Sequence, residues 1–389
     1  MKQRPALRPS APRAESFFVK AATVFPRVFL VPRRKVQQSL GRIRFLFLLA
    51  AITPVLAQLT LAQEVLPHYT VVDRGPSLVR TLTDTPGLNN HGDMAIWHAE
   101  TASLMPGLVF HGKDTISIEG EKNFTLVYPT DINDRLTVVG NLQEPQDLRF
   151  TLAFKWTDQK LEILESLGGA YSSASAVNAA GDVVGSAETR SGEKHAVLWR
   201  TKQPRDLGLL AQGDYSSARD INDKNDIVGE ANLVPNGKPQ AFFWHAGKMK
   251  QLPNLPGGTI CSAQAINNSG AIIGSCDLHN SSTQHGVIWR NGSIQDLGTL
   301  GDEYAPTTAL DINNLGQVVG NSSDDDKLRA FLWENGKIIN LNKLIAPDSG
   351  WTLLVASRIN DKGEIIGRGY FHRTIHAFML QPDQAVNKK

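Results

Sequence analysis

Apolar and polar residues alternate in short blocks along most of this chain, and one block of ten residues recurs seven times. Its clearest copies run from Ala265 to Gly274 and from Asp311 to Gly320. In most copies an apolar residue and Asn lead into a polar turn, and a β-branched stretch that ends in Gly follows. β-Branched residues favour strands, and Asn-rich turns favour hairpins. The pattern therefore predicts a β-hairpin at every copy.

The spacing between copies is nearly constant. The first Asn of one copy lies 44 to 47 residues before the first Asn of the next. A fixed period of this length indicates a repeat architecture in which each repeat is one supersecondary unit. The chain therefore divides into seven repeats over residues 66–381, followed by a polar tail over residues 382–389. The marker residues are Asn89, Asn133, Asn178, Asn222, Asn267, Asn313 and Asn360.

Each repeat holds two predicted strands besides the hairpin. A short strand and a Gly-rich loop precede the hairpin, and a fourth strand follows it. Four strands in about 45 residues are typical of a propeller blade, whereas a β-solenoid uses shorter coils and needs end caps. We therefore predict an all-β chain that forms a seven-bladed β-propeller of four-stranded blades, with a β-solenoid as the alternative. Five fourth strands end in Trp, which we expect to pack between blades: Trp156, Trp199, Trp244, Trp289 and Trp333.

A different composition marks the start of the chain. Residues 1–44 are rich in Arg, Lys and Pro and are expected to be a disordered basic leader, and residues 45–62 are mostly apolar. This order predicts an N-terminal signal or anchor helix over 45–62. Its apolar run is interrupted by Pro54 and Gln58, which favours a cleaved signal over a membrane-spanning anchor. Cleavage would place the protein in the periplasm or outside the cell, and membrane contact is expected only if the segment stays uncleaved.

The net charge of +2 for the whole chain does not show how unevenly the charges are distributed. Residues 1–57 hold eleven Lys or Arg and one acidic residue, which leaves a net charge of −8 on the rest of the chain. Phosphate binding requires a basic surface, so the globular part is not expected to bind nucleic acid. Only two Cys occur, which excludes a multi-disulfide scaffold and a Cys-rich metal site.

Several motifs together resemble one known family. The segment His376-Ala377-Phe378, the Trp-ended strands, the Leu-Gly loops and the Ile-Asn-x-x-Gly-x-Val-Val-Gly block are similar to the HAF-repeat family of extracellular proteins, over about residues 66–381. The resemblance implies export and a repetitive β fold, but no established reaction and no catalytic residues. The first repeat departs most, because its fourth strand near residues 108–110 lacks Trp.

Catalytic signatures are absent from the sequence: it contains no Gly-x-Ser-x-Gly elbow, Walker loop or His-Glu-x-x-His. No catalytic residue, confident metal site or cofactor is predicted. Three His recur at one repeat position, which suggests a shared structural place. The run Asp324-Asp325-Asp326 is a weak Ca²⁺ candidate, and a solvated loop tip is the simpler explanation, because three consecutive residues rarely supply the converging oxygens that Ca²⁺ needs.

Carboxylates also recur two residues before the marker Asn. Asp131, Asp220 and Asp311 occupy this position in alternate repeats. If that face lines a central channel, they form an acidic ring able to hold a cation or a basic group. The alternative is that each Asp accepts hydrogen bonds from its own hairpin turn.

The two cysteines flank the fifth hairpin. If Ile266 faces Ala271, continuing the register places Cys261 directly opposite Cys276. Opposed residues in antiparallel strands lie at a distance that a disulfide can span. A bulge or a one-residue slip would place the sulfurs on opposite faces and leave two free thiols. We predict the disulfide, because an exported chain meets an oxidising compartment.

Three classes of function fit these observations. The first is an exported, non-catalytic and monomeric binding or interaction module for an unknown extracellular ligand or protein. The second is a hydrolase or lyase with a carboxylate site on one propeller face, since such enzymes need paired carboxylates at a set distance. The third is a membrane-anchored surface structural protein.

Overall fold

The computed structural model describes residues 68–76, 86–98, 104–279 and 281–383. The predicted leader over 1–44 and signal or anchor helix over 45–62 lie outside these residues, as does most of the polar tail. Within the described residues, no helix is long and apolar enough to cross a membrane.

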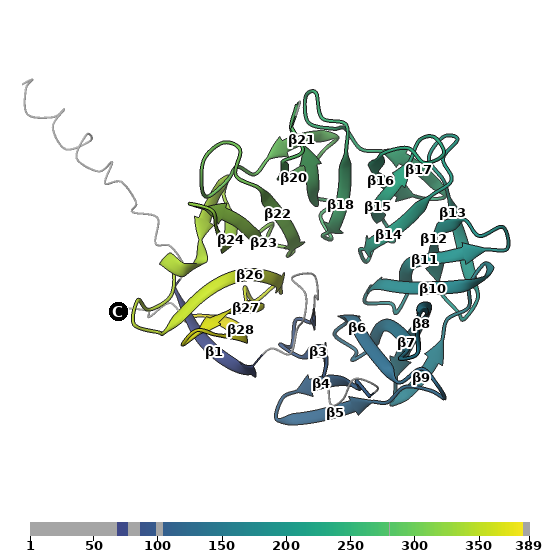
Figure 1. Ribbon diagram of the computed structural model, residues 1–389, viewed down its shortest axis with the longest axis horizontal. Helices are drawn as coiled ribbons and strands as arrows, with labels where there is room; N and C mark the ends of the chain where they lie inside the picture. Colours follow the sequence, from purple (N-terminus) through teal and green to yellow (C-terminus); the bar gives the residue numbers. More distant parts are fainter. Residues whose placement is uncertain (1–67, 77–85, 99–103, 280, 384–389) are drawn as a thin grey trace, which may run out of the picture. The chain divides into compact units, whose positions relative to one another are not determined.

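Seven four-stranded antiparallel sheets stand around a ring, so the chain is a seven-bladed β-propeller and not a solenoid (Figure 1). Six blades use four consecutive strands, from the innermost to the outermost. The first three are β2 (Gly87–Leu88), β3 (Met94–Trp97), β4 (Gly107–His111) and β5 (Asp114–Ile118); β6 (Leu126–Ile132), β7 (Val138–Glu144), β8 (Asp147–Thr157) and β9 (Lys160–Ile163); and β10 (Gly168–Val177), β11 (Val183–Thr189), β12 (Lys194–Trp199) and β13 (Pro204–Gly208).

The next three blades repeat this order. A short 3₁₀ helix, η1 (Leu341–Lys343), follows the last of them. Their strands are β14 (Ser216–Ile221), β15 (Ile227–Asn232), β16 (Pro239–His245) and β17 (Lys248–Gln251); β18 (Cys261–Ile266), β19 (Ile272–Asp277), β20 (Gln284–Arg290) and β21 (Ser293–Asp296); and β22 (Thr307–Ile312), β23 (Val318–Asp324), β24 (Lys327–Glu334) and β25 (Lys337–Asn340).

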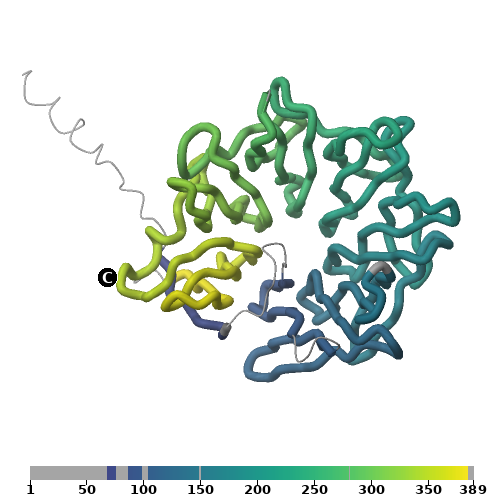
Figure 2. Tube along the Cα trace, viewed as in Figure 1, coloured from purple at the N-terminus to yellow at the C-terminus, as the bar shows by residue number. Residues whose placement is uncertain are grey.

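The seventh blade joins the two ends of the propeller. It takes β26 (Trp351–Ile359), β27 (Ile365–Phe371) and β28 (Thr374–Pro382) from the C-terminal part, and β1 (Tyr69–Pro76) as its outermost strand. Tyr69 pairs with Pro382, and the antiparallel register continues to Asp73 opposite Phe378. The purple N-terminal strand therefore lies beside the yellow C-terminal blade (Figure 2). The sequence pattern predicts a short strand before each hairpin, but it does not show that the first of them pairs with the end of the chain.

Hydrophobic clusters fill the spaces between blades. Each of the five predicted Trp residues is buried in a cluster that combines its own blade with the preceding one. Trp289, for example, packs among residues of the fourth and fifth blades, and its Nε1 donates to the carbonyl of Pro253 at 2.7 Å. The predicted packing of Trp between blades is therefore confirmed.

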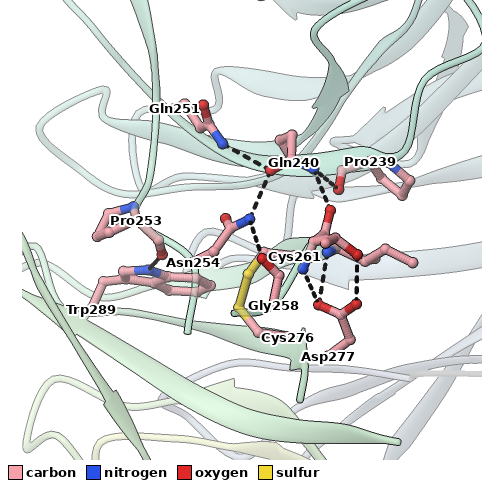
Figure 3. Close-up of a disulfide and its surroundings, with 12 residues drawn as sticks. Pro239, Gln240, Gln251, Pro253, Asn254, Gly258, Cys261, Cys276, Asp277 and Trp289 are labelled. Carbon is pink, nitrogen blue, oxygen red and sulfur yellow. Dashed lines mark hydrogen bonds between the residues drawn. A yellow bond between two sulfur atoms is a disulfide. The ribbon is translucent and has the colours of Figure 1, made fainter. Parts of the chain in front are cut away.

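The disulfide between Cys261 and Cys276 is confirmed, but the predicted register next to the turn is wrong. Ile266 pairs with Ile272 and not with Ala271, because the turn is one residue longer than expected. A one-residue β-bulge at Gln264 compensates for the longer turn and brings the cysteines opposite each other. Figure 3 shows the bond beside Asp277, whose carboxylate accepts from the backbone N–H groups at Thr259 and Ile260.

Candidate functional site

The seven marker asparagines form a closed ring around the propeller axis. Each side-chain Nδ2 donates to the backbone carbonyl of the marker Asn in the next blade, over 2.9 to 3.4 Å. Each Oδ1 accepts from two backbone N–H groups of its own turn, which fixes the orientation of the amide. The sequence pattern predicts only that these residues lie in turns. The bonds between blades also require a donor, which explains Asn in preference to Asp.

A second ring runs through the residues that follow the marker asparagines. In six blades the backbone N–H of this residue donates to the side-chain Oδ1 of its counterpart in the next blade. The seventh contact would need an acceptor at Ala179, whose side chain has none. This second ring carries three carboxylates and marks one mouth of the channel: Asp134, Asp223 and Asp361.

The three predicted ring carboxylates lie around the channel, and each joins two blades. In Asp220, Oδ1 accepts from the N–H of Ile221 and Oδ2 accepts from the N–H of Ile266 in the next blade, both at 2.8 Å. Asp131 and Asp311 make the same pair of bonds. The bond to the next blade was not foreseen, because the sequence does not show which backbone groups lie across a blade boundary.

Burial raises the pKa of all three carboxyl groups. It raises the pKa of Asp131 to about 6 and that of Asp220 to about 8, and it raises the pKa of Asp311 as well. The backbone N–H groups oppose this effect in each case. At Asp131 and Asp311 the Arg358 guanidinium also opposes it, whereas at Asp220 the other two carboxylates raise the pKa further.

Arg358 occupies the matching position in the seventh blade. Its Nη2 donates to the carbonyl of Thr130 in the second blade at 3.3 Å, past the first blade. The first blade has Gly87 at this position, and a Cβ there would lie 2.9 Å from the backbone of Asp131. At this position of the repeat, three carboxylates and one guanidinium therefore line the channel.

Two cavities lie along the channel, and Asp131, Asp311 and Arg358 line both. The turn-side cavity, of about 210 Å³, is bounded by the marker asparagines and the second ring. The bulge-side cavity, of about 220 Å³, lies at the other end, where residues that bulge from the innermost strands line its wall. These residues are Thr130, Ser175, Arg219, Gln264 and Leu310.

The bulge position is the functional feature that sequence analysis missed. Six blades carry a one-residue bulge three residues before the marker Asn, and the identity of that residue changes from blade to blade. The signal in the sequence is this variability within an otherwise regular repeat. A bulge turns a side chain out of the regular strand alternation, and here it turns side chains toward the channel.

The other predicted site residues lie away from the channel. Asp325 and Asp326 are the two central residues of a hairpin turn, with φ of 48° and 57°, and Asp324 pairs with Lys327. His195, His285 and His376 lie on different blades, and the Nδ1 atom of each is 2.7 to 2.9 Å from an Asp of the outermost strand. No group of three or more His, Cys, Asp or Glu among the described residues could hold a metal ion.

No family model matches the chain, and no curated protein matches it. Solved structures share its fold. A puromycin hydrolase variant matches with a TM-score of 0.50 at 10% identity, over 78% of this chain and 55% of that one. The β-propeller domain of the Trilobed protease from Pyrococcus furiosus matches with a TM-score of 0.48 at 13% identity, over 66% and 80%. TolB from Acinetobacter baumannii matches with a TM-score of 0.41 at 14% identity, over 78% and 66%. These identities establish a similarity of fold alone.

Proposed function

We propose that this protein is an exported, non-catalytic binding module whose ligand occupies the bulge-side cavity. One observation carries the proposal: the repeat varies at the bulge position, and five of the six bulged residues line this cavity. Concave sites with a few converging polar groups are the usual place for small ligands. The bulged residues place hydroxyl, amide and guanidinium groups on the cavity wall. The marker asparagines, in contrast, form hydrogen bonds between blades.

The carboxylates favour a ligand with a cationic group. Asp131, Asp220 and Asp311 line the bulge-side cavity together with two arginines, Arg219 and Arg358, so the cavity holds more acidic than basic side chains. A positive group that enters would favour the ionised carboxylates and offset the cost of burying them. Both oxygens of each carboxylate already accept a backbone N–H, whereas Ca²⁺ needs about six to eight oxygen ligands, so an organic ammonium or guanidinium fits better than a metal ion.

Export is supported by the buried disulfide. Cys261 and Cys276 are both fully buried and bonded, and such structural disulfides form and persist in oxidising compartments. The signal or anchor segment over 45–62, the HAF-repeat resemblance and the monomeric state remain predictions.

A thermal-unfolding screen tests the proposed function. Organic amines, guanidinium compounds and Ca²⁺ or Mg²⁺ salts would be added to the purified protein, and a ligand that binds only the folded state raises Tm. We expect organic cations to raise Tm in the parent protein and to lose this effect in Asp220→Asn. Asp158→Asn, an exposed carboxylate in a hairpin turn between outer strands, is the matched control. Stabilisation by divalent salts alone, or an equal response in Asp220→Asn, would contradict the proposal.

A hydrolase is the second candidate, and one observation favours it. Asp131 and Asp220 line the same cavity and have different raised pKa values, as an acid–base pair requires. Against this, both oxygens of each carboxylate already accept backbone N–H groups. Turnover of nitrophenyl esters or glycosides that is lost in Asp131→Asn would establish the hydrolase and overturn the binding module.

A further inference from the structure

The wall of the bulge-side cavity is cationic where the third and fourth blades meet. Arg219 lines the cavity and its side chain is 41% exposed. Its Nη2 donates to Glu230 Oε1 at 2.8 Å. Among the described residues, no other side chain forms a hydrogen bond with the Arg219 guanidinium. A guanidinium has five N–H donors, so Arg219 retains donors for a ligand.

A second cation, Lys194, is connected to this wall through Tyr171. Lys194 Nζ donates to the Tyr171 hydroxyl at 3.3 Å and lies 4.7 Å from the centre of that ring and 6.0 Å from the ring of Tyr215. Among the described residues, no carboxylate forms an ion pair with Lys194. Burial raises the pKa of Tyr171, but the ammonium and nearby hydroxyl groups outweigh this, and the net pKa is lowered. Lys194 is thus a half-buried cation without an anion.

A ring contact and hydrogen bonds connect the two cations to each other and to the cavity. Tyr215, whose ring lies next to Lys194, donates from its hydroxyl to Glu230 Oε1 at 2.9 Å, the same atom that Arg219 contacts. Tyr171 also bonds the side chain of Ser173, which lines the cavity. This network, named here the cationic rim, comprises Tyr171, Lys194, Tyr215, Arg219 and Glu230.

We infer that the ligand is a small zwitterion of the free α-amino acid class, with its ammonium toward the channel carboxylates and its carboxylate at the cationic rim. The inference rests on the proposed function and adds the anionic half of the ligand. It follows from the charges at and beside the cavity. Arg219 lines the cavity, and Lys194 is linked to it through Tyr171 and Ser173, so these two cations outnumber Glu230 in the cationic rim. The three channel carboxylates line the same cavity. The volume of about 220 Å³ is below the range of about 300–1,000 Å³ for drug-sized ligands, so the ligand is small.

Isothermal titration calorimetry of the full protein with three matched series of compounds tests the inference. Free amino acids carry both charges, their methyl esters keep the cation alone, and their N-acetyl derivatives keep the anion alone. We expect free amino acids to bind at least tenfold more tightly than the esters, and the N-acetyl compounds not to bind. Arg219→Gln and Lys194→Met should lower the affinity for amino acids toward that of the esters and leave the affinity for the esters unchanged.

Arg200→Gln is the matched control. Arg200 is an exposed arginine in an ion pair with Asp182, away from the cavity, and its loss should leave all three affinities unchanged. Equal affinity for amino acids and esters would overturn the role of the rim while the proposed function stands. Binding of the N-acetyl compounds without the esters would overturn the cationic preference and with it the proposed function. If none of the three series binds, both are wrong.

Discussion

The side-chain Nδ2 of Asn360 donates to the backbone carbonyl of Asn89 at 3.1 Å, although the two residues are 271 positions apart. This bond completes the ring of seven asparagines by joining the last blade to the first. The strand pair β1–β28 closes the same junction from the outside. The propeller is therefore closed near its axis by side-chain hydrogen bonds and at its outer edge by backbone pairing between strands.

Replacing Asn267 by Asp should destabilise the propeller by about 1–3 kcal/mol, because a buried carbonyl loses its donor and a charge is buried. The lost bond is the one from Nδ2 to the Asn313 carbonyl. Urea unfolding measures the change in the free energy of unfolding. Asn291→Asp, the same substitution in an exposed turn with positive φ, is the control and should have little effect. Equal losses in both variants would show that the ring is not responsible.

Stability should fall as the pH rises from about 4 to about 8. The folded state holds a proton on Asp220 up to about pH 8, whereas an unfolded Asp releases it near pH 4, so the folded state binds more protons in this interval. One such group contributes a slope of up to about 1.4 kcal/mol per pH unit. Asp220→Asn removes the titration, so urea unfolding at several pH values should give a flatter profile. A profile as steep as that of the parent would contradict the assigned pKa.

Loss of the disulfide should lower the free energy of unfolding by about 3 kcal/mol, the loop-entropy value for a separation of 15 residues. The double variant Cys261→Ala, Cys276→Ala measures this loss by urea unfolding. Alkylation followed by mass spectrometry should detect two thiols only after denaturation and reduction, because both side chains are fully buried. Two thiols that alkylate in the denatured protein without reductant would show that the bond is not formed.

Truncation should separate the leader from the propeller. Removing residues 1–64 leaves every described strand in place, so a folded monomer is expected. Extending the deletion through Pro76 removes β1 and exposes the edge of β28, which invites pairing between molecules. Light scattering after size-exclusion chromatography should then show oligomers or aggregates for the longer deletion alone. A monomeric product of the longer deletion would mean that β1 is dispensable for closure.

The repeat period was sufficient to predict the number of blades and of strands per blade, because each apolar stretch forms one strand. The disulfide prediction was correct although two register errors lay behind it. The longer turn and the bulge at Gln264 each shift the pairing by one residue, and neither changes the pattern of apolar residues. The partners of Asp220 and Asn267 could not be predicted, since both bonds cross to a neighbouring blade.

Seven is an odd number, and a ring of odd size cannot be divided completely into pairs. The carboxylates of Asp131, Asp220 and Asp311 join the second blade to the third, the fourth to the fifth and the sixth to the seventh. Among its described residues, the first blade has no such bond to a neighbour. Gly87 stands at that unpaired place, and the Arg358 side chain reaches past it to Thr130. This single defect removes the rotational symmetry of the channel. In a symmetric channel a ligand could bind in several equivalent orientations. In this channel the orientations are not equivalent, so the odd number of blades fixes how a ligand would be oriented.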